Sequence, residues 1–303
     1  LLFLLGSGVW VAISMIGVST LGMILFTSRP VGDAMATTIW GTSSSWTLTA
    51  LPLFVWMGEI LFRTRLSENL FAGLSPWMQK LPGGLIHVNV VGCALFAAIS
   101  GSSAATVATV GKMSIPELRK RKYPEKILIG SLAGSGTLGL LIPPSIILII
   151  YGVTVQESIA KLFIAGIIPG IMIALIFMSY VIIWSLINKK SMPSYIEKFT
   201  FLEKIKKSKQ LLPVIILISA VIGSIYTGVA TATEAASLGV VGALILSYFQ
   251  KSLTIETFKK SLLGATKTSC MIAFILAGST FLSLAMGFTG LPRNLAIWIQ
   301  NME

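Results

Sequence analysis

Hydroxyl side chains and glycines gather in two short stretches of this chain, each inside strongly apolar sequence. The first is residues 100–103 (Ser-Gly-Ser-Ser). The second, residues 131–152, contains adjacent Pro143 and Pro144, which lack amide hydrogens and clash with a continuing helix. We expect these prolines to leave the carbonyls of residues 139–141 unpaired, and carbonyls and hydroxyls are hard oxygen ligands. Because broken helices also expose N-terminal amides, the two stretches predict a site for a small cation such as sodium and for a carboxylate.

The composition places these stretches in a membrane protein. The chain has 303 residues, of which 54% are hydrophobic and 11% are charged, and its mean hydropathy is +0.87. Soluble domains carry about 25% charged residues. Cys93 and Cys270 both lie in apolar segments, so neither a disulfide framework nor a metal-binding cluster is predicted. The net charge of +12 does not indicate nucleic-acid binding, because the basic residues fall in a few loops between apolar segments.

The apolar runs predict an all-α polytopic fold, since several of them reach the roughly 20 residues that cross a bilayer. We expect an amphipathic interfacial helix after the second span and two spans that are interrupted within the membrane. The first segment lacks a basic start and is followed directly by further spans, so it is not a cleavable signal. The expected spans and helices cover residues 3–26, 49–62, 67–80, 84–114, 127–153, 160–188, 211–226, 234–249 and 268–289.

The distribution of basic residues favours a hairpin for residues 84–114. If this segment enters the membrane and returns to the same side, all but three of the 23 Lys and Arg residues fall on one face, which is cytoplasmic by the positive-inside rule. A single crossing would instead separate the basic cluster at residues 119–122 from the basic residues that precede the segment. The three exceptions are Arg29, Lys161 and Arg293.

The tip of this re-entrant hairpin is predicted at residues 100–103, near the middle of the membrane. Residues 84–99 rise about 24 Å as a helix at 1.5 Å per residue. Non-helical backbone at that depth is tolerated only where it is buried in protein or faces water, and glycine supplies the turn. The alternative is one kinked helix whose small residues pack closely against a neighbour.

Several longer stretches resemble one known family in the order in which they occur. They are PLFVWMGEIL, AAISGSSAATVATVGKMSIPEL, GSLAGSGTLGLLIPPSIILIIYGV, SIAKLFIAGIIPGI and GVATATEAASLGVVGAL. Together they cover most of the chain. The chain is similar to the large membrane subunit of TRAP (tripartite ATP-independent periplasmic) transporters.

The resemblance implies an elevator-type secondary transporter with inverted repeats, in which a transport domain of re-entrant hairpins and broken helices moves against a scaffold. It implies no enzymatic activity and no cofactor, with Na⁺ as the coupling ion. The imported substrate would be an organic anion, such as a dicarboxylate, a sialic acid or another carboxylate. The expected partners are a periplasmic substrate-binding protein, a small four-helix membrane subunit and membrane lipids. The expected location is the bacterial inner (cytoplasmic) membrane, as a multi-pass protein.

The resemblance also assigns residues to two sites. The sodium-binding residues would be Ser100, Gly101, Ser102, Ser103, Gly134, Ser135, Gly136 and Thr137. The substrate-binding residues would be Ser103, Ala104, Thr106, Pro143 and Pro144. No arginine lies in these segments, so anion binding is expected to depend on hydroxyls, backbone amides and the charge of sodium. The identity of the substrate stays open.

The same resemblance divides the chain into four parts. We expect scaffold helices and the interfacial helix in residues 1–80, the hairpin and broken helix of the transport domain in 81–155, and connecting scaffold helices in 156–265. Residues 266–303 would begin a second repeat, because residues 279–299 faintly echo residues 51–74. The family usually carries a second hairpin and a TPP-type broken helix beyond this point, so we expect the natural protein to be longer.

Some charged residues have structural interpretations. Thr231 and Glu234 fit a capping box at a helix start, although an intramembrane carboxylate can also mark an ion pathway. Glu59 and Arg63 stand four residues apart on one predicted helix and are expected to pair. The basic cluster of residues 119–122 is expected to contact anionic lipid headgroups.

Two other classes of function are open. An intramembrane hydrolase would use Ser102 as nucleophile and His87 as base, but a separation of 15 residues along one arm is roughly 20 Å, too far for a hydrogen bond. His87 lies early in the hairpin, close to the membrane interface, where we expect a structural role in preference to proton coupling, while Asn89 is a candidate for lining the site. A channel or passive scaffold subunit is the second alternative. No GxxxxGK[ST] sequence occurs, so the chain has no ATP-binding loop of that type.

Overall fold

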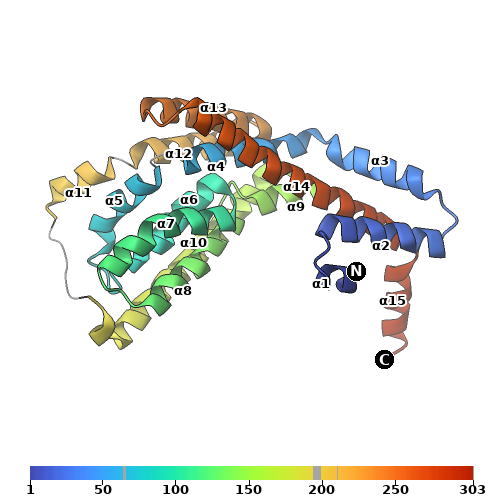
Figure 1. Cartoon of the computed structure of the whole chain (residues 1–303), viewed down its shortest axis with the longest axis horizontal. Helices are drawn as coiled ribbons and strands as arrows, with labels where there is room; N and C mark the ends of the chain where they lie inside the picture. The colour runs from blue at the N-terminus through green and yellow to red at the C-terminus, as the bar shows by residue number, and fades with distance from the viewer. Residues whose placement is uncertain (64–65, 194–198, 210, 303) are drawn as a thin grey trace. The chain divides into compact units, whose positions relative to one another are not determined.

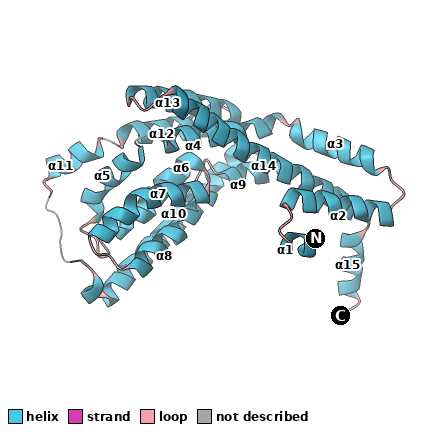
Figure 2. Cartoon of the chain, in the orientation of Figure 1, coloured by secondary structure: helices cyan, strands magenta, loops and turns pink. Residues whose placement is uncertain are grey.

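The computed structural model describes residues 1–63, 66–193, 199–209 and 211–302, except for the side chains of residues 66–69. Within these ranges the chain consists of α-helices, short 3-10 helices labelled η, and loops, without a strand (Figures 1 and 2). The predicted all-α fold is confirmed. In the described chain, 3 helices are long and apolar enough to cross a membrane, or up to 5 if each bent helix pair is one span. The 3 helices are α10 (Ile159–Ile187), α13 (Ala232–Phe249) and α14 (Ile255–Phe288).

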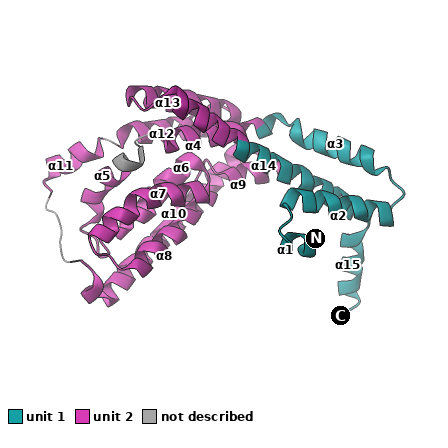
Figure 3. Ribbon diagram, in the orientation of Figure 1, with its two compact units in different colours: residues 1–48, 267–303 teal, residues 49–266 magenta. Residues whose placement is uncertain are grey.

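The chain divides into two compact units, residues 1–48 with 267–303 and residues 49–266 (Figure 3). The first unit has a small apolar core in which Met23 packs against Phe281 and Ala285. Gly278 brings two of its helices together, because a side chain there would lie 3.0 Å from the carbonyl oxygen of Ala12. The helices of this unit are α1 (Leu2–Gly6), α2 (Val11–Phe26), α3 (Val31–Ser43), the end of α14, and α15 (Leu291–Gln300).

The second unit contains the two interrupted segments. Its helix α13 packs along α4, and α6 packs against both α7 and α8, as the neighbouring ribbons in Figure 1 show. The predicted boundary between residues 265 and 266 lies next to the division of the units, but the assignment of scaffold and transport parts stays a prediction. The bounds are η1 (Trp46–Thr49, at the division), α4 (Ala50–Phe62), α5 (Leu66–Met78), α6 (Ile86–Ser100), α7 (Ser103–Lys120), α8 (Glu125–Gly136), η2 (Thr137–Leu140), α9 (Ile146–Val155), α10, η3 (Lys189–Ser191), α11 (Phe201–Ser208), α12 (Leu212–Tyr226) and α13.

Three predicted helix boundaries were wrong. The segment predicted to end at residue 114 continues as α7 to Lys120. Residues 3–26 form two helices, α1 and α2, because the poor helix formers Ser7 and Gly8 interrupt them and Gly8 has a φ of 83°. The last long span begins at Ile255 instead of residue 268. Its basic first turns remain helical, since Glu256 and Lys260 form an ion pair at 2.5 Å across one turn.

Two of the structural roles predicted for charged residues are confirmed, those of Glu59 with Arg63 and of Thr231 with Glu234. Glu59 accepts a hydrogen bond from the guanidinium of Arg63 at 2.9 Å, within one turn of α4. At the start of α13, the amide of Glu234 donates to the Thr231 hydroxyl at 3.3 Å, and the Glu234 carboxylate accepts from the Thr231 amide at 2.8 Å. This reciprocal capping box satisfies two amides that have no partner inside a helix.

The capping box at α13 is expected to contribute measurably to stability. Thr231→Ala removes the acceptor for the Glu234 amide and should lower the free energy of unfolding by about 1 kcal/mol. Thr231→Ser keeps the hydroxyl and should keep most of that stability. The measurement is the thermal unfolding midpoint of the purified chain in detergent. Equal midpoints for the alanine and serine variants would contradict the contribution of the cap.

Candidate functional site

Helices α6 and α7 form a hairpin, because the two ends that lie farthest from the connecting turn meet again. The amide of Leu85, just before α6, donates to the phenol oxygen of Tyr123, just after α7, at 3.0 Å. A single kinked helix would separate these residues by its full length. The hairpin is therefore confirmed in preference to a kinked span, and its depth and direction in a membrane stay predictions.

Glycine and hydroxyl groups build the tip of this hairpin. Gly101 ends α6 in the left-handed conformation, with a φ of 57°, and donates its amide to Ala97 at 3.0 Å. Ser102 caps α7 by accepting from the Ala105 amide at 3.4 Å. The hydroxyls of Ser100 and Thr106 are 2.9 Å apart and hydrogen-bonded across the turn. The tip is thus closed by its own short side chains.

The second interruption separates α8 from α9. After α8 the chain continues as η2, passes through the buried Pro143 and Pro144, and begins α9 at Ile146. The expectation that the carbonyls of residues 139–141 are unpaired was wrong for Leu140, because its oxygen accepts from the Ser145 hydroxyl at 2.6 Å. Ser145 thus supplies a donor in place of the amides that the prolines lack.

The two interruptions lie against each other. The amide of Ile146, at the start of α9, donates to the carbonyl of Gly101 at 3.4 Å. A side chain on Gly101 would be 2.9 Å from the Pro144 oxygen, and one on Gly139 would be 3.1 Å from the Ser103 nitrogen. The backbones therefore approach where only glycine leaves room. Segments far apart in sequence, near residues 101 and 139–146, form one local site.

Ser103 supplies an uncommitted oxygen at this site. Its hydroxyl is buried and has no hydrogen-bond partner among the described residues. A side chain at Gly136 would lie 3.7 Å from the Ser103 carbonyl oxygen, so the end of α8 passes close to the start of α7. A buried hydroxyl without a partner is unfavourable unless a ligand or water satisfies it. Among the predicted site residues, Ser103 is therefore the strongest candidate for direct contact with an ion or substrate.

The other predicted site residues differ in their burial and in their hydrogen bonds. Ser135 is buried and donates its hydroxyl to the Ser131 carbonyl, while Thr137 is exposed and donates to the Gly134 carbonyl at 2.7 Å. Both hydroxyl oxygens keep lone pairs for a cation. Ala104 is exposed. The structure buries Thr106 completely and bonds it to Ser100, so in this conformation Thr106 faces the interior of the hairpin.

Two polar residues on the hairpin arm lie away from the tip. Asn89 donates to the Ser131 hydroxyl at 3.0 Å and to the Leu128 carbonyl at 3.3 Å, so it joins α6 to α8. His87 hydrogen-bonds to the Pro82 carbonyl at 2.8 Å, near the open end of the hairpin. This hydrogen bond fits a structural role for His87, which stays a prediction. Ser102 lies at the opposite end of α6, which excludes a hydrogen-bonded nucleophile and base.

Sequence reasoning missed Gly58 of α4. A side chain at Gly58 would lie 2.8 Å from the Cα atom of Ser100 and 3.2 Å from the Ile99 oxygen, so α4 supports the hairpin tip from another side. The only available signal was its place in the apolar stretch PLFVWMGEIL, which a helix pattern alone does not distinguish from ordinary packing.

Comparison with known proteins identifies the family. Residues 1–303 match the model of the family described as "Tripartite ATP-independent periplasmic transporter, DctM component". The chain belongs to the DctM family. It is therefore a large permease component of a TRAP transporter, a multi-pass membrane protein and not an enzyme, and the resemblance seen in the sequence is confirmed.

The names of three relatives of this DctM-family chain refer to different substrates. The C4-dicarboxylate TRAP transporter large permease of Pseudomonas aeruginosa is 32% identical over 288 residues, which cover 95% of this chain and 67% of the relative. The sialic acid TRAP transporter large permease of Vibrio cholerae is 33% identical over 296 residues, covering 97% and 68%. The isethionate TRAP transporter permease DctMQ of Oleidesulfovibrio alaskensis is 32% identical over 293 residues, covering 95% and 45%.

The close backbone contact at the tip should make Gly101 intolerant of substitution. Gly101→Ala introduces a side chain at a positive φ and 2.9 Å from the Pro144 oxygen. We therefore expect the free energy of unfolding to fall by about 1–2 kcal/mol. Gly130→Ala is the matched control, because nothing lies within 4 Å of that position in α8. Thermal unfolding in detergent compares the two. Equal stability of both variants would contradict the proximity of the two interruptions.

Proposed function

We propose that this chain is the large membrane subunit of a sodium-coupled secondary transporter that imports an organic anion. The observation that carries the proposal is the meeting of the hairpin tip with the second interruption, which leaves the buried Ser103 hydroxyl unpartnered among the described residues. Broken helices that meet within a bundle are typical of secondary transporters. The site offers neutral oxygens, which suit sodium, and no arginine lies in its segments.

The sodium ion is proposed to bind between residues 100–103 and 134–137. The Ser135 and Thr137 hydroxyls already donate to carbonyls and can present lone pairs to a cation, and Ser103 can do so without breaking a hydrogen bond. Bound sodium would add positive charge beside the first turn of α7, where backbone amides point outward. Both features favour an anionic substrate near Ser103, Ala104 and the paired prolines.

The substrate class follows from the chemistry of this site and from the relatives. The names of the three relatives refer to a C4-dicarboxylate, a sialic acid and isethionate, all of which are anions. Amides, hydroxyls and a cation can bind a carboxylate without an arginine. We propose a carboxylate-bearing substrate, delivered by a periplasmic binding protein. The remaining proposed components are a small four-helix membrane subunit, an elevator motion of the hairpin-containing part, and a location in the bacterial inner membrane.

Transport by the reconstituted complex tests this function. The chain is placed in proteoliposomes with the small membrane subunit and the binding protein encoded beside it, and uptake of a labelled anion is measured with and without an inward sodium gradient. We expect accumulation that requires both the gradient and the binding protein. Uptake that equilibrates the anion regardless of sodium would indicate a channel, and no uptake with any binding protein would indicate a scaffold.

Ser103 should affect the sodium dependence specifically. Ser103→Ala removes the free hydroxyl, and losing one contact to a charged partner costs ~1.5 kcal/mol or more, so the sodium concentration for half-maximal uptake should rise about tenfold. Ser114→Ala is the matched control, since Ser114 lies on the same helix and its buried hydroxyl also lacks a partner among the described residues. Identical sodium dependence in the two variants would argue against the assignment of Ser103.

A further inference from the structure

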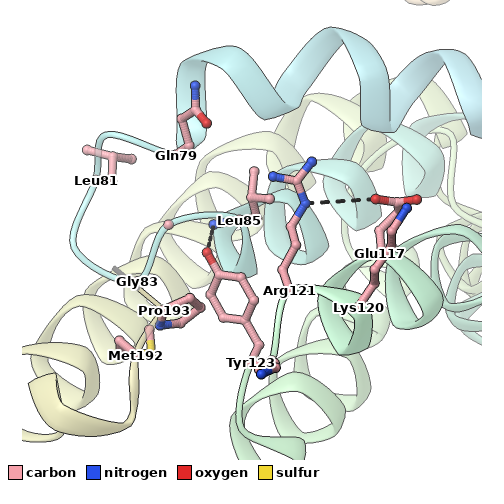
Figure 4. A pocket seen from close by; sticks show the side chains of 12 residues that line it. Gln79, Leu81, Gly83, Leu85, Glu117, Lys120, Arg121, Tyr123, Met192 and Pro193 are labelled. Atoms are coloured by element: carbon pink, nitrogen blue, oxygen red, sulfur yellow. Dashed lines mark hydrogen bonds and ion pairs between the residues drawn. The ribbon is translucent and has the colours of Figure 1, made fainter. Parts of the chain in front are cut away.

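A pocket lies at the open end of the hairpin, far along α6 and α7 from the tip. It has a volume of about 450 Å³ and lies between the loop before α6, the end of α7 with the turn that follows, and the segment after η3 (Figure 4). Its lining includes Leu81, Leu85, Lys120, Arg121, Lys122 and Tyr123. No residue of the proposed sodium or substrate site lines this pocket.

The surroundings of the pocket place it at the level of lipid headgroups. Met192, which lines it, follows closely after the 29-residue apolar helix α10. Tyr123 and Trp184 pack around the buried core of Ile86, Ile127 and Val181 beside it. Such amphipathic aromatic side chains are enriched where a membrane protein passes from hydrocarbon to water. The positive-inside pattern predicts that this is the cytoplasmic surface.

The pocket has an excess of positive charge. Among the described lining residues there are three cations, Lys120, Arg121 and Lys122, and one carboxylate, Glu117. The Glu117 carboxylate oxygen is 3.8 Å from the Arg121 guanidinium (Figure 4). Lys120 and Lys122 form no ion pair with any described residue. Two ammonium groups therefore remain to bind an anion. Lysine binds phosphate as a point charge, without a fixed geometry.

The rest of the lining suits an amphiphile. Leu81, Leu85, Met192 and Pro193 supply apolar surface beside the cations. The phenol of Tyr123 accepts a hydrogen bond from Leu85, so its own O–H remains to donate to a ligand. A small hydrophilic anion would leave the apolar wall uncovered, whereas a phospholipid presents a phosphate next to its glycerol and acyl chains.

We propose that this pocket binds the phosphate of an anionic phospholipid headgroup, with Lys120 and Lys122 as the main contacts and the apolar wall against the glycerol region. Basic pockets on the cytoplasmic side of membrane helices bind such headgroups by the same chemistry. The bound lipid would connect the base of the hairpin, through Tyr123 and Leu85, to the membrane surface. The site is independent of the proposed sodium site.

Native mass spectrometry of the purified chain in detergent tests this site. Phosphatidylglycerol, phosphatidylethanolamine and inorganic phosphate are titrated separately. We expect phosphatidylglycerol to bind more tightly than phosphatidylethanolamine, and the Lys120→Gln/Lys122→Gln variant to bind phosphatidylglycerol about thirtyfold more weakly, which is the scale expected for two lysines near an anionic lipid. The Lys120→Arg/Lys122→Arg variant should retain binding, which separates loss of charge from misfolding.

The matched control is Lys259→Gln/Lys267→Gln, two exposed lysines of α14 that do not line the pocket. This variant should bind phosphatidylglycerol as the unchanged chain does. An equal loss in both glutamine variants would show a nonspecific charge effect and overturn the site. Binding of inorganic phosphate as tight as that of the lipid would overturn the lipid assignment in favour of a free anion.

Discussion

The local architecture of the second unit depends on one contact between backbones. The carbonyl of Gly101, exposed by the end of α6, is satisfied by the Ile146 amide, exposed by the start of α9. Inside an apolar bundle an unpaired peptide group costs free energy, so each interruption needs a partner. Glycine at 101 and 139 removes the side chains that would separate the two chains. Each interruption therefore satisfies a backbone group of the other.

The hairpin is held differently at its two ends. At the tip, short polar side chains close the turn, and the buried Ser103 hydroxyl has no hydrogen-bond partner among the described residues. At the base, Tyr123 bonds to Leu85 and packs beside Ile86, Ile127 and Val181. Uncharged polar groups gather at the tip, where sodium and substrate binding is proposed. Apolar side chains pack at the base, where the two arms of the hairpin are joined. Asn89, in the first turn of α6, adds a polar connection to α8 near the base.

Much of the fold was predictable because membrane helices obey simple rules. The hairpin followed from where the lysines and arginines lie, since a single crossing would scatter them over both faces. The box at Thr231 and Glu234 followed from local spacing alone. The start of α14 was predicted incorrectly, because charge was taken to end a helix, while an ion pair between Glu256 and Lys260 lets it continue.

The sequence by itself determined the membrane class, the family, the two interruptions and the residue types that they contain. These depend on composition, short-range order and resemblance, which are all properties of the linear chain. Only the tertiary structure decided that Gly139 lies under the hairpin tip, that Gly58 supports it and that Thr106 faces inward. It also joined residues near 80, 120 and 192 into the basic pocket at the hairpin base. Such contacts join segments tens of residues apart, and side-chain size and hydrogen-bond direction select them only once the helices have packed.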